Sequence, residues 1–576
     1  MPTPHHPSTP GALMRDIVWR NRVRLAIGWL LLSLHQACEA AVPIAIGVTI
    51  DVAVDTGDPI ALAWCVGGIV ALFTVLALAW RFGSRFGVTA MQHEIHRVRM
   101  LVASRALDPR GITSGNNTGE TLSLATSDAE KTALIVRAVS MGIAATVALV
   151  VSATALLRIN LTLGLSVLIG VPLLLGALQA LAPWLSRRSA DAQEATASAT
   201  GVATDLVTGL RTLRGIGATD NGAVRYRTAS RAALNRSLSA ANSAGVFQGV
   251  TTALSGLFLA GIASFAGWFA LTDRISVGEL VTIVGLAQFI AEPMQTLGYC
   301  GQIAAIARGS ARRVVEMLNT APLVEDHGTA APSPDAPTVI ELEEVSYRGL
   351  SKLNLSVGRD EVLGIVCHDP GDADALLALL GRRAAPNDHT GEIRVGGVPI
   401  ADIDLATLRE FVHLEPHQAD LFEGTLADNL AARLPADAPV DAIDRAVSAA
   451  AATDVVAAHP DGLERRLTDR GASLSGGQRQ RIGVARALVA APRVLVLHDA
   501  TTAIDAATEE RLAEGLIAMR GLDDDAGLAT VAITSSPALL GKAHRVVVID
   551  GGRIVADGVH SDLIDRVESY RTAVLR

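Results

Sequence analysis

The sequence predicts a membrane domain of six transmembrane helices with long cytoplasmic extensions, followed by an α/β domain. Half of the 576 residues are hydrophobic and only 19% are charged. Six apolar runs of membrane-spanning length fall within residues 1–320. After a Pro/Ala-rich linker at residues 326–337, the sequence changes to short strand-like runs that alternate with helical patterns. A net charge of −9 argues against a nucleic-acid-binding protein, so no nucleic acid is expected as a partner.

The six apolar runs are separated by breaks that alternate short, long, short, long and short. Each run can supply the roughly 20 residues that cross a bilayer. The long breaks, near residues 85–137 and 186–242, are polar but mostly lack helix-breaking clusters, so we expect helices that continue into water. The spans are predicted at about 25–50, 61–84, 138–158, 161–185, 243–272 and 277–307.

The distribution of charge predicts the orientation in the membrane. Arginines gather before the first span and in the two long segments, whereas the short connections carry Asp51, Asp55, Asp58 and Asp273. The positive-inside rule then places both termini and the second domain in the cytoplasm. We therefore expect a multi-pass protein surrounded by the lipid of a bacterial cytoplasmic membrane. The four cysteines form no C-x-x-C pair, so neither a zinc site nor a disulfide framework is expected.

Residues 338–576 alternate between short β-branched runs and helical patterns. The runs at 362–366, 494–497, 530–534 and 545–549 are typical of buried strands. Their alternation with helices predicts an α/β domain of about 240 residues.

One motif in this second domain identifies a family. Leu474, Ser475, Gly476, Gly477 and Gln478 precede a helical run, and the strand 494–497 follows, then the sequence His498–Asp505. This order resembles the signature motif, Walker B strand and D-loop of ATP-binding cassette (ABC) proteins. Bare glycine backbone at the start of a helix suits a bound phosphate. Six spans before one cassette resemble a half-transporter with the type IV exporter fold.

The phosphate loop departs from the family pattern, which ends in Gly-Lys-Ser/Thr after a strand. Cys367–Ala375 reads Cys-His-Asp-Pro-Gly-Asp-Ala-Asp-Ala. The resemblance places Ala373 at the lysine position and Asp374 at the magnesium-binding hydroxyl. Cys367, Pro370 and Asp372 fall where glycines belong. Because like charges about 4 Å apart repel by ~4 kcal/mol at an effective dielectric near 20, we expect these aspartates to disfavour a triphosphate.

Other catalytic positions of the family are also altered. The resemblance places His498 at the Walker B aspartate, Asp499 at the catalytic glutamate, His417 at the Q-loop glutamine and Ser535 at the switch histidine. A shortened side chain positions a general base poorly, and loss of that base commonly costs ~10²–10⁴-fold in rate. We therefore expect no intact catalytic residue. The histidines could instead form a metal cluster with His368, but we expect no metal site.

The resemblance implies a division of labour between two chains. Family members pair two cassettes, and each ATP lies between one chain's Walker motifs and the other chain's signature motif. We therefore expect a heterodimer with a catalytically competent half-transporter whose Walker motifs hold most of the ATP and Mg²⁺. Leu474–Gln478, Arg470 and Asp505 would contact that ATP. The chain alone would be inactive, and the complex would be a translocase ATPase coupled through cytoplasmic helices near Arg110–Gly115 and Thr212–Ala218.

The substrate and the direction of transport stay open. Export of a small molecule or peptide is the first expectation, an importer of siderophore-type cargo is one alternative, and a regulatory membrane pseudoenzyme is another. Glu39, Gln288 and Glu292 are candidates for the substrate pathway, because ionisable or polar groups at membrane depth are usually functional. A structural hydrogen bond within the spans is the competing interpretation of the same residues.

Overall fold

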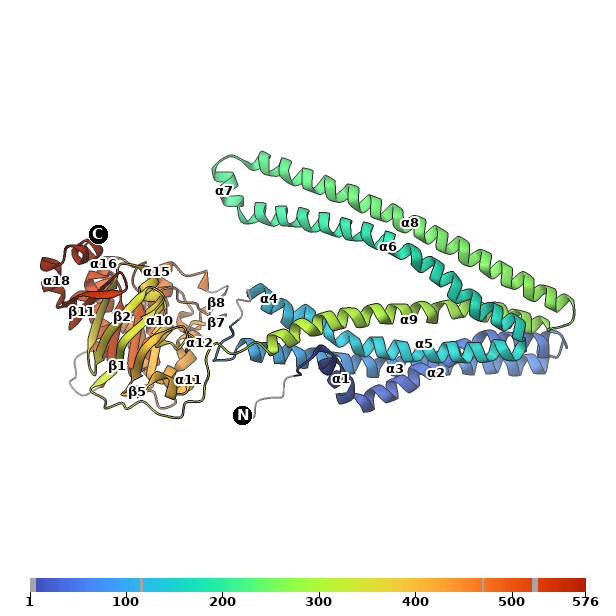
Figure 1. The fold of residues 1–576 in the computed structure, drawn as a ribbon, viewed down its shortest axis with the longest axis horizontal. Coiled ribbons are helices and arrows are strands. Elements are labelled where there is room, and N and C mark those ends of the chain that lie inside the picture. The colour runs from blue at the N-terminus through green and yellow to red at the C-terminus, as the bar shows by residue number, and fades with distance from the viewer. Residues whose placement is uncertain (1–6, 114–117, 469–470, 521–526, 576) are drawn as a thin grey trace. The chain divides into compact units, whose positions relative to one another are not determined.

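The chain folds into two compact units in the computed structural model, which describes all residues except 1–6, 114–117, 469–470, 521–526 and 576, and the side chains of 118 and 179–186. The first unit contains residues 1–105 and 116–319. The second contains residues 106–115 and 320–576. A short piece of the N-terminal half therefore folds with the C-terminal half (Figure 1).

The first unit is entirely helical in its described residues. Six of its helices are long and apolar enough to cross a membrane, which confirms the prediction of a multi-pass membrane domain. Its helices are α1 (Pro10–Arg20), α2 (Arg22–Thr49), α3 (Pro59–Ala106), α4 (Thr118–Ser123), α5 (Ala129–Ile159), α6 (Leu161–Thr208), α7 (Leu210–Gly215), α8 (Thr219–Leu271) and α9 (Val277–Leu318).

Several of these helices exceed the thickness of a bilayer. At ~1.5 Å per residue, the 48 residues of α6 and the 53 of α8 reach far beyond the ~30 Å of hydrocarbon. The short helix α7 joins them, where we expected a helix near Thr212–Ala218. The helix expected near Arg110–Gly115 is wrong for its described part, because Pro109 and the positive φ of Gly111 (71°) make a turn there.

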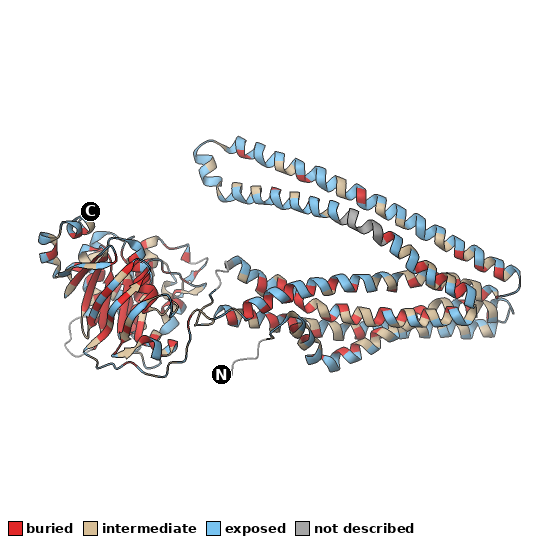
Figure 2. Cartoon of the chain, viewed as in Figure 1, coloured by how far each residue is buried: buried red, intermediate tan, exposed pale blue. Residues whose placement is uncertain are grey.

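Helices α2, α5 and α9 form the packed centre of this unit. Figure 2 shows buried residues concentrated along them, whereas the α6–α8 hairpin is mostly exposed. Gly47 of α2 approaches Gly278 of α9 so closely that a Cβ on Gly47 would lie 2.3 Å from the carbonyl oxygen of Gly278. Asp51 accepts a hydrogen bond from the Gly278 N–H at 2.8 Å. Asp128 and Arg313 pair nearer the other ends of α5 and α9.

The second unit is an α/β domain, as the strand and helix patterns predict. A six-stranded sheet has the order β12-β11-β3-β10-β9-β6, in which only β12 is antiparallel. A four-stranded antiparallel sheet has the order β2-β1-β4-β5. The strands are β1 (Thr338–Tyr347), β2 (Leu350–Gly358), β3 (Val362–Cys367), β4 (Thr390–Val395), β5 (Val398–Pro399), β6 (Val412–Glu415), β7 (Gly424–Thr425), β8 (Arg466–Leu467), β9 (Val494–His498), β10 (Ala529–Ile533), β11 (Arg545–Asp550) and β12 (Arg553–Gly558).

The helices of this unit cover the sheets and bury two large apolar clusters. They are α10 (Pro370–Leu380), α11 (Leu405–Phe411), α12 (Leu426–Leu430), α13 (Ala442–Ala449), α14 (Thr453–Ala457), α15 (Gly476–Val489), α16 (Ala506–Arg520), α17 (Pro537–Gly541), α18 (His560–Arg566) and α19 (Glu568–Val574).

A buried arginine joins α16 to the six-stranded sheet. Arg520 is 6% exposed and donates hydrogen bonds to the Pro492 carbonyl at 2.9 Å and the Ala529 carbonyl at 3.0 Å. Its removal leaves these acceptors without a donor, so we expect Arg520→Met to lower the free energy of unfolding by about 2–3 kcal/mol. Urea unfolding of the full chain measures this. Arg553→Met, at an exposed position, should change it by less than about 0.5 kcal/mol.

Candidate functional site

A cleft of about 630 Å³ opens where the parallel strands β3, β9 and β10 end. The carboxyl ends of such strands are the usual ligand-binding edge of an α/β sheet. The residues that follow these strands line the cleft together with α19. Nine family positions are altered, and six of them border the cleft directly, namely Cys367, Pro370, Ala373, His498, Asp499 and Ser535. His417 and Asp374 are exposed nearby, and the ring of His417 lies 6.2 Å from that of His498.

The backbone N–H groups of Gly371 and Asp372, in the loop after β3, are hydrogen-bonded to acceptors within the same loop. Helix α10 begins at Pro370, and Asp369 caps it by accepting the Gly371 N–H at 2.8 Å. The Asp372 N–H donates to the Asp369 carbonyl at 3.1 Å, and Pro370 has no N–H. A helix N-terminus normally offers free N–H groups to an anion. Here the chain's own carboxylate takes the place that a phosphate would need.

Asp372 adds a second carboxylate, inside this loop. It is 2% exposed, and its Oδ2 accepts the Gly552 N–H at 3.2 Å. Burial raises the pKa of Asp372, and the neighbouring Asp369 raises it further. Burial and nearby aspartates likewise raise the pKa of the Cys367 thiol to about 12. The loop is therefore acidic and satisfied internally, and Ala373, which is 3% exposed, brings no positive charge.

The histidines and the aspartate at the carboxyl ends of β3 and β9 lie close to neighbouring side chains and backbone carbonyls. His498 Nε2 lies 3.9 Å from Asp499 Oδ2. The Asp499 carbonyl accepts a hydrogen bond from Gln480 at 3.3 Å, and the Asp499 backbone has a positive φ of 46°. His368 Nδ1 lies 3.3 Å from the Ile549 carbonyl. Among the described residues, no three potential ligands come together closely enough to hold a metal ion.

His498 should make the stability of this unit fall on acidification. Burial lowers the pKa of His498 below its ordinary 6.5, although the Asp499 and Asp374 carboxylates act in the opposite direction. The unfolded chain therefore binds more protons just below pH 6.5, and the free energy of unfolding decreases as the pH falls through that window. We expect His498→Gln to reduce this decrease, measured as thermal midpoints at pH 7.5 and 5.5. Equal pH dependence in both proteins would contradict it.

The start of α15 has the opposite character to the start of α10. Ser475 and Gln478 form a capping box, in which Ser475 Oγ accepts the Gln478 N–H at 3.2 Å. The helix begins at Gly476, so the N–H groups of Gly476 and Gly477 have no acceptor within it. Ser475 is exposed and Leu474 is buried beneath it. This end of the helix can therefore receive an anion.

The D-loop is fixed against this helix start. A Cβ on Gly477 would lie 2.5 Å from the Ala503 carbonyl oxygen, so only glycine fits. Gln480 donates to Thr502 Oγ1 and accepts the Ala503 N–H, both at 2.9 Å. Gln480 was not among the residues predicted to matter, because this contact spans 23 residues and no local pattern marks it.

Asp505 lies at the end of the D-loop. It caps α16 by accepting the Thr508 N–H at 3.0 Å, and hydrogen bonds from the Thr508 side chain and from its backbone lower the pKa of the Asp505 carboxyl. Arg470, which we expected beside the signature motif, lies outside the described residues.

Comparisons with known proteins agree with this geometry. Residues 25–294 match the family described as the ABC transporter transmembrane region, and residues 350–502 match the ABC transporter family. The chain belongs to the ABC transporter family. A solved structure of a bacterial Atm1-family ABC exporter with ATP bound superposes with a TM-score of 0.75, over 96% of this chain and 98% of that one. At 22% identity this likeness shows the fold, which is the predicted half-transporter arrangement.

Two relatives of this ABC chain differ in how much of their own length the chain covers. The multidrug efflux ATP-binding/permease protein of Mycobacterium tuberculosis is 34% identical over 66% of this chain. This chain spans only 32% of the length of that relative. The mycobactin import ATP-binding/permease protein IrtB of Mycobacterium bovis is 28% identical over 94% of both chains.

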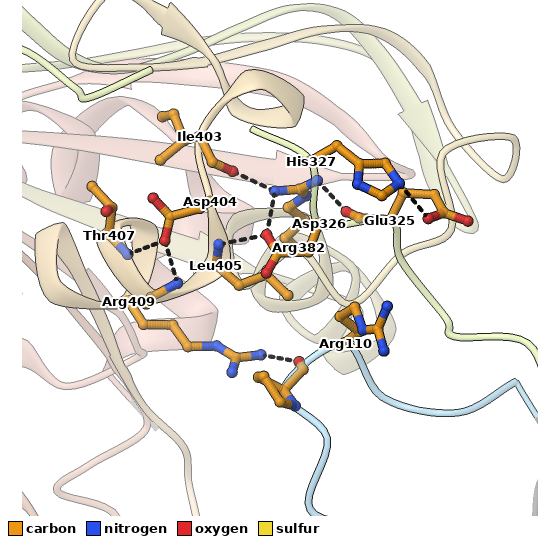
Figure 3. Close-up of polar contacts among 12 residues, drawn as sticks. Arg110, Glu325, Asp326, His327, Arg382, Ile403, Asp404, Leu405, Thr407 and Arg409 are labelled. Atoms are coloured by element: carbon orange, nitrogen blue, oxygen red, sulfur yellow. Dashed lines mark hydrogen bonds and ion pairs between the residues drawn. The ribbon is translucent and has the colours of Figure 1, made fainter. Parts of the chain in front are cut away.

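A polar junction joins the ABC domain to the linker and to residues 106–115 (Figure 3). Arg382 follows α10 and donates to the carbonyls of Glu325 and Ile403. Asp326 Oδ1 accepts the Leu405 N–H at 2.9 Å, at the start of α11. From the other end of that helix, Arg409 donates to the Pro109 carbonyl at 2.7 Å.

We expect Arg382→Ala to release the linker from this junction. Each hydrogen bond from a charged donor contributes about 1.5–3 kcal/mol, so local opening of the linker should increase at least about tenfold. Limited proteolysis of the full chain measures the cleavage rate within residues 325–337. Arg383→Ala is the matched control, since the neighbouring Arg383 is exposed and makes no side-chain hydrogen bond among the described residues. Equal rates for the two variants would contradict the role of Arg382.

Two of the three candidates for a substrate pathway lie near each other in the structure, since the carboxyls of Glu39 and Glu292 are close enough to interact as like charges. Glu292 lines a cavity between the membrane helices. Glu39 lies just beyond that cavity and accepts a hydrogen bond from Gln36 at 2.8 Å, so it has a structural partner. Gln288 is exposed and does not line the cavity. The sequence interpretation missed Trp80 and Arg137, which do line it, because nothing in their own spans marks them.

Proposed function

We propose that this ABC transporter chain is one subunit of a heterodimer that couples ATP hydrolysis to movement of a substrate across the membrane. The contrast between the N-termini of α10 and α15 carries the proposal. The former is capped by Asp369 and bordered by the buried Asp372, whereas the latter presents the N–H groups of Gly476 and Gly477, which donate to no acceptor among the described residues. One end repels a phosphate and the other receives it.

ATP and Mg²⁺ do not fit this chain's own loop. The family's lysine position is occupied by Ala373, and its hydroxyl position is occupied by Asp374. The N–H groups in the first turn of α10 already have acceptors within the loop. The partner's Walker motifs would therefore hold the nucleotide and its metal. Ser475, Gly476 and Gly477 would complete the site from the opposite side, and the capping box together with Gln480 would keep them in place.

Two copies of this chain would form no complete site, because each site needs an intact phosphate loop from one of its chains. This is why we propose a second, competent half-transporter. The free N–H groups of α15 also argue against a purely regulatory pseudoenzyme, which would have no use for a phosphate-receiving helix. Both termini and the ABC domain would lie in the cytoplasm, in agreement with the arginine distribution.

Export is the proposed direction, in keeping with the multidrug efflux relative. One observation favours import as a second candidate, namely that the mycobactin import relative aligns over 94% of both chains. Transport of a labelled substrate into inside-out and right-side-out vesicles separates the two directions.

The deciding experiment measures ATPase activity of the full chain alone and of the chain with the half-transporter that co-purifies from native membranes. We expect activity only in the two-chain complex, and we expect it to disappear when the partner's Walker lysine is replaced. ATP hydrolysis by the isolated chain would contradict the proposal. Isolation from native membranes as a homodimer alone would contradict it equally.

A further inference from the structure

The membrane unit encloses a cavity of about 370 Å³ between α2, α3, α5 and α9. Most of its lining is apolar and includes Leu32, Val88, Met91, Val136 and Ala144. The aromatic ring of Trp80 also faces it. Cavities of roughly 300–1,000 Å³ with apolar walls and a few polar groups are typical of small-molecule sites.

Most polar groups of this cavity already have partners in the protein. His35 lies 3.6 Å from Glu39, and Gln36 donates to the same carboxylate. Ser140 accepts a hydrogen bond from the Trp29 indole at 2.9 Å and donates to the Val136 carbonyl. These residues are therefore satisfied without a ligand.

Two opposite charges in the lining lack such partners. Arg137 of α5 is exposed and donates one hydrogen bond, to Met141 Sδ at 3.4 Å, and a thioether is a weak acceptor. Glu292 of α9 is exposed, and among the described residues it has neither a hydrogen bond nor a cationic partner. Glu292 lies inside the predicted span 277–307, and an unpaired charge at membrane depth is costly and marks a functional site. Arg137 directly precedes the predicted span 138–158, at the edge of the membrane.

The two charges lie toward opposite ends of the cavity. Helices α5 and α9 run antiparallel, and Gly142 lies opposite Cys300, because a Cβ on Gly142 would be 3.9 Å from Cys300 Sγ. Arg137 is five residues from Gly142 in one direction, and Glu292 is eight residues from Cys300 in the other. At ~1.5 Å per residue their backbones are roughly 20 Å apart along the helices, a gap that both long side chains shorten.

We propose that this cavity binds an elongated zwitterionic amphiphile, whose anionic group meets Arg137 and whose cationic group meets Glu292. The proposal rests on the transport function above and names the class of its substrate. A monovalent amphiphile would leave one of the two protein charges unpaired, whereas a molecule with a charge at each end neutralises both. The apolar wall and the ring of Trp80 would contact the chain between the two groups.

Quenching of Trp80 fluorescence tests this in the full chain, in nonionic detergent without nucleotide or partner. The probes are a dibrominated ω-aminododecanoate and two analogues of the same chain, one without the ammonium group and one without the carboxylate. Because the protein has six tryptophans, the signal of a Trp80→Phe variant is subtracted. We expect the Kd of the zwitterion to be at least about tenfold lower than that of either analogue.

Charge variants make the assignment specific. Arg137→Gln should weaken only the probes that carry a carboxylate, by roughly ten- to a hundredfold, and Arg137→Lys should restore them. Glu292→Gln should weaken only the probes that carry an ammonium group, and Glu292→Asp should restore them. Equal affinity for all three probes, or a variant that weakens all three alike, would overturn the proposal. The two proposals can fail separately. If the chain binds the probes with these preferences but its complex has no ATPase activity, the proposed transport function is wrong and the proposed binding site is still supported.

Discussion

We expect Ser475→Ala to lower the ATPase rate of the two-chain complex by roughly ten- to a hundredfold, because a hydrogen bond to a charged group contributes about 1.5–3 kcal/mol. Ser475 caps α15 and stands beside the free N–H groups of Gly476 and Gly477. The steady-state rate at saturating ATP measures the effect on the complex, and thermal unfolding of the same sample shows whether the ABC domain is still folded.

A second capping box provides the control for this substitution. Thr425 caps α12 with the same reciprocal bonds: its Oγ1 accepts the Asp428 N–H, and its own N–H donates to the Asp428 carboxylate, both at 2.9 Å. Thr425→Ala should lower stability by about 1 kcal/mol, as Ser475→Ala does, but leave the ATPase rate within about twofold. If both variants lose activity together, the loss reflects helix stability and the signature assignment is wrong.

The second large effect concerns the loop after β3. We expect the wild-type chain alone to bind ATP at least about a hundredfold more weakly than a variant with six substitutions: Cys367→Gly, Asp369→Ala, Pro370→Gly, Asp372→Gly, Ala373→Lys and Asp374→Ser. The reason is electrostatic, since each like charge about 4 Å from a phosphate costs ~4 kcal/mol at an effective dielectric near 20. The variant removes three carboxylates, including the cap of α10, and adds an ammonium group. Equilibrium binding of a fluorescent ATP analogue measures the difference.

The single variant Ala373→Lys is the matched comparison. Because Asp369, Pro370 and Asp372 remain, the start of α10 is still capped and acidic, and the lysine alone should improve ATP binding less than about tenfold. Tight ATP binding by the single variant, or by the wild-type chain, would show that the capped loop opens readily. The proposed division of labour between two chains would then lose its structural basis.

Sequence patterns predicted the parts of this protein that depend on local chemistry. Apolar runs of fixed length gave the six spans, and the glycines after Ser475 gave the helix start of the signature motif. Asp369 was interpreted only as a charge, although an aspartate before a proline is also a typical helix cap. As a helix cap, Asp369 occupies an N–H group of α10 that would otherwise be available to a phosphate.

Other features depend on contacts that no local pattern encodes. Gln480 reaches residues more than 20 positions away, and the cavity brings Trp80, Arg137 and Glu292 together from three helices. The expected helix near Arg110 failed for a local reason, because Pro109 and Gly111 favour a turn. The same segment then pairs with the residues just before the linker, where the Val324 N–H donates to the Arg110 carbonyl at 3.2 Å.

The membership of residues 106–115 in the second unit means that the polypeptide passes between the two units three times. Cutting the chain within residues 331–336 should leave the two fragments associated without a covalent link, because residues 106–115 and 320–330 belong to the second unit and stay hydrogen-bonded to it. An isolated domain that starts at residue 338 would lack both the linker and the segment that Arg382 and Arg409 hold, and would expose this surface to water.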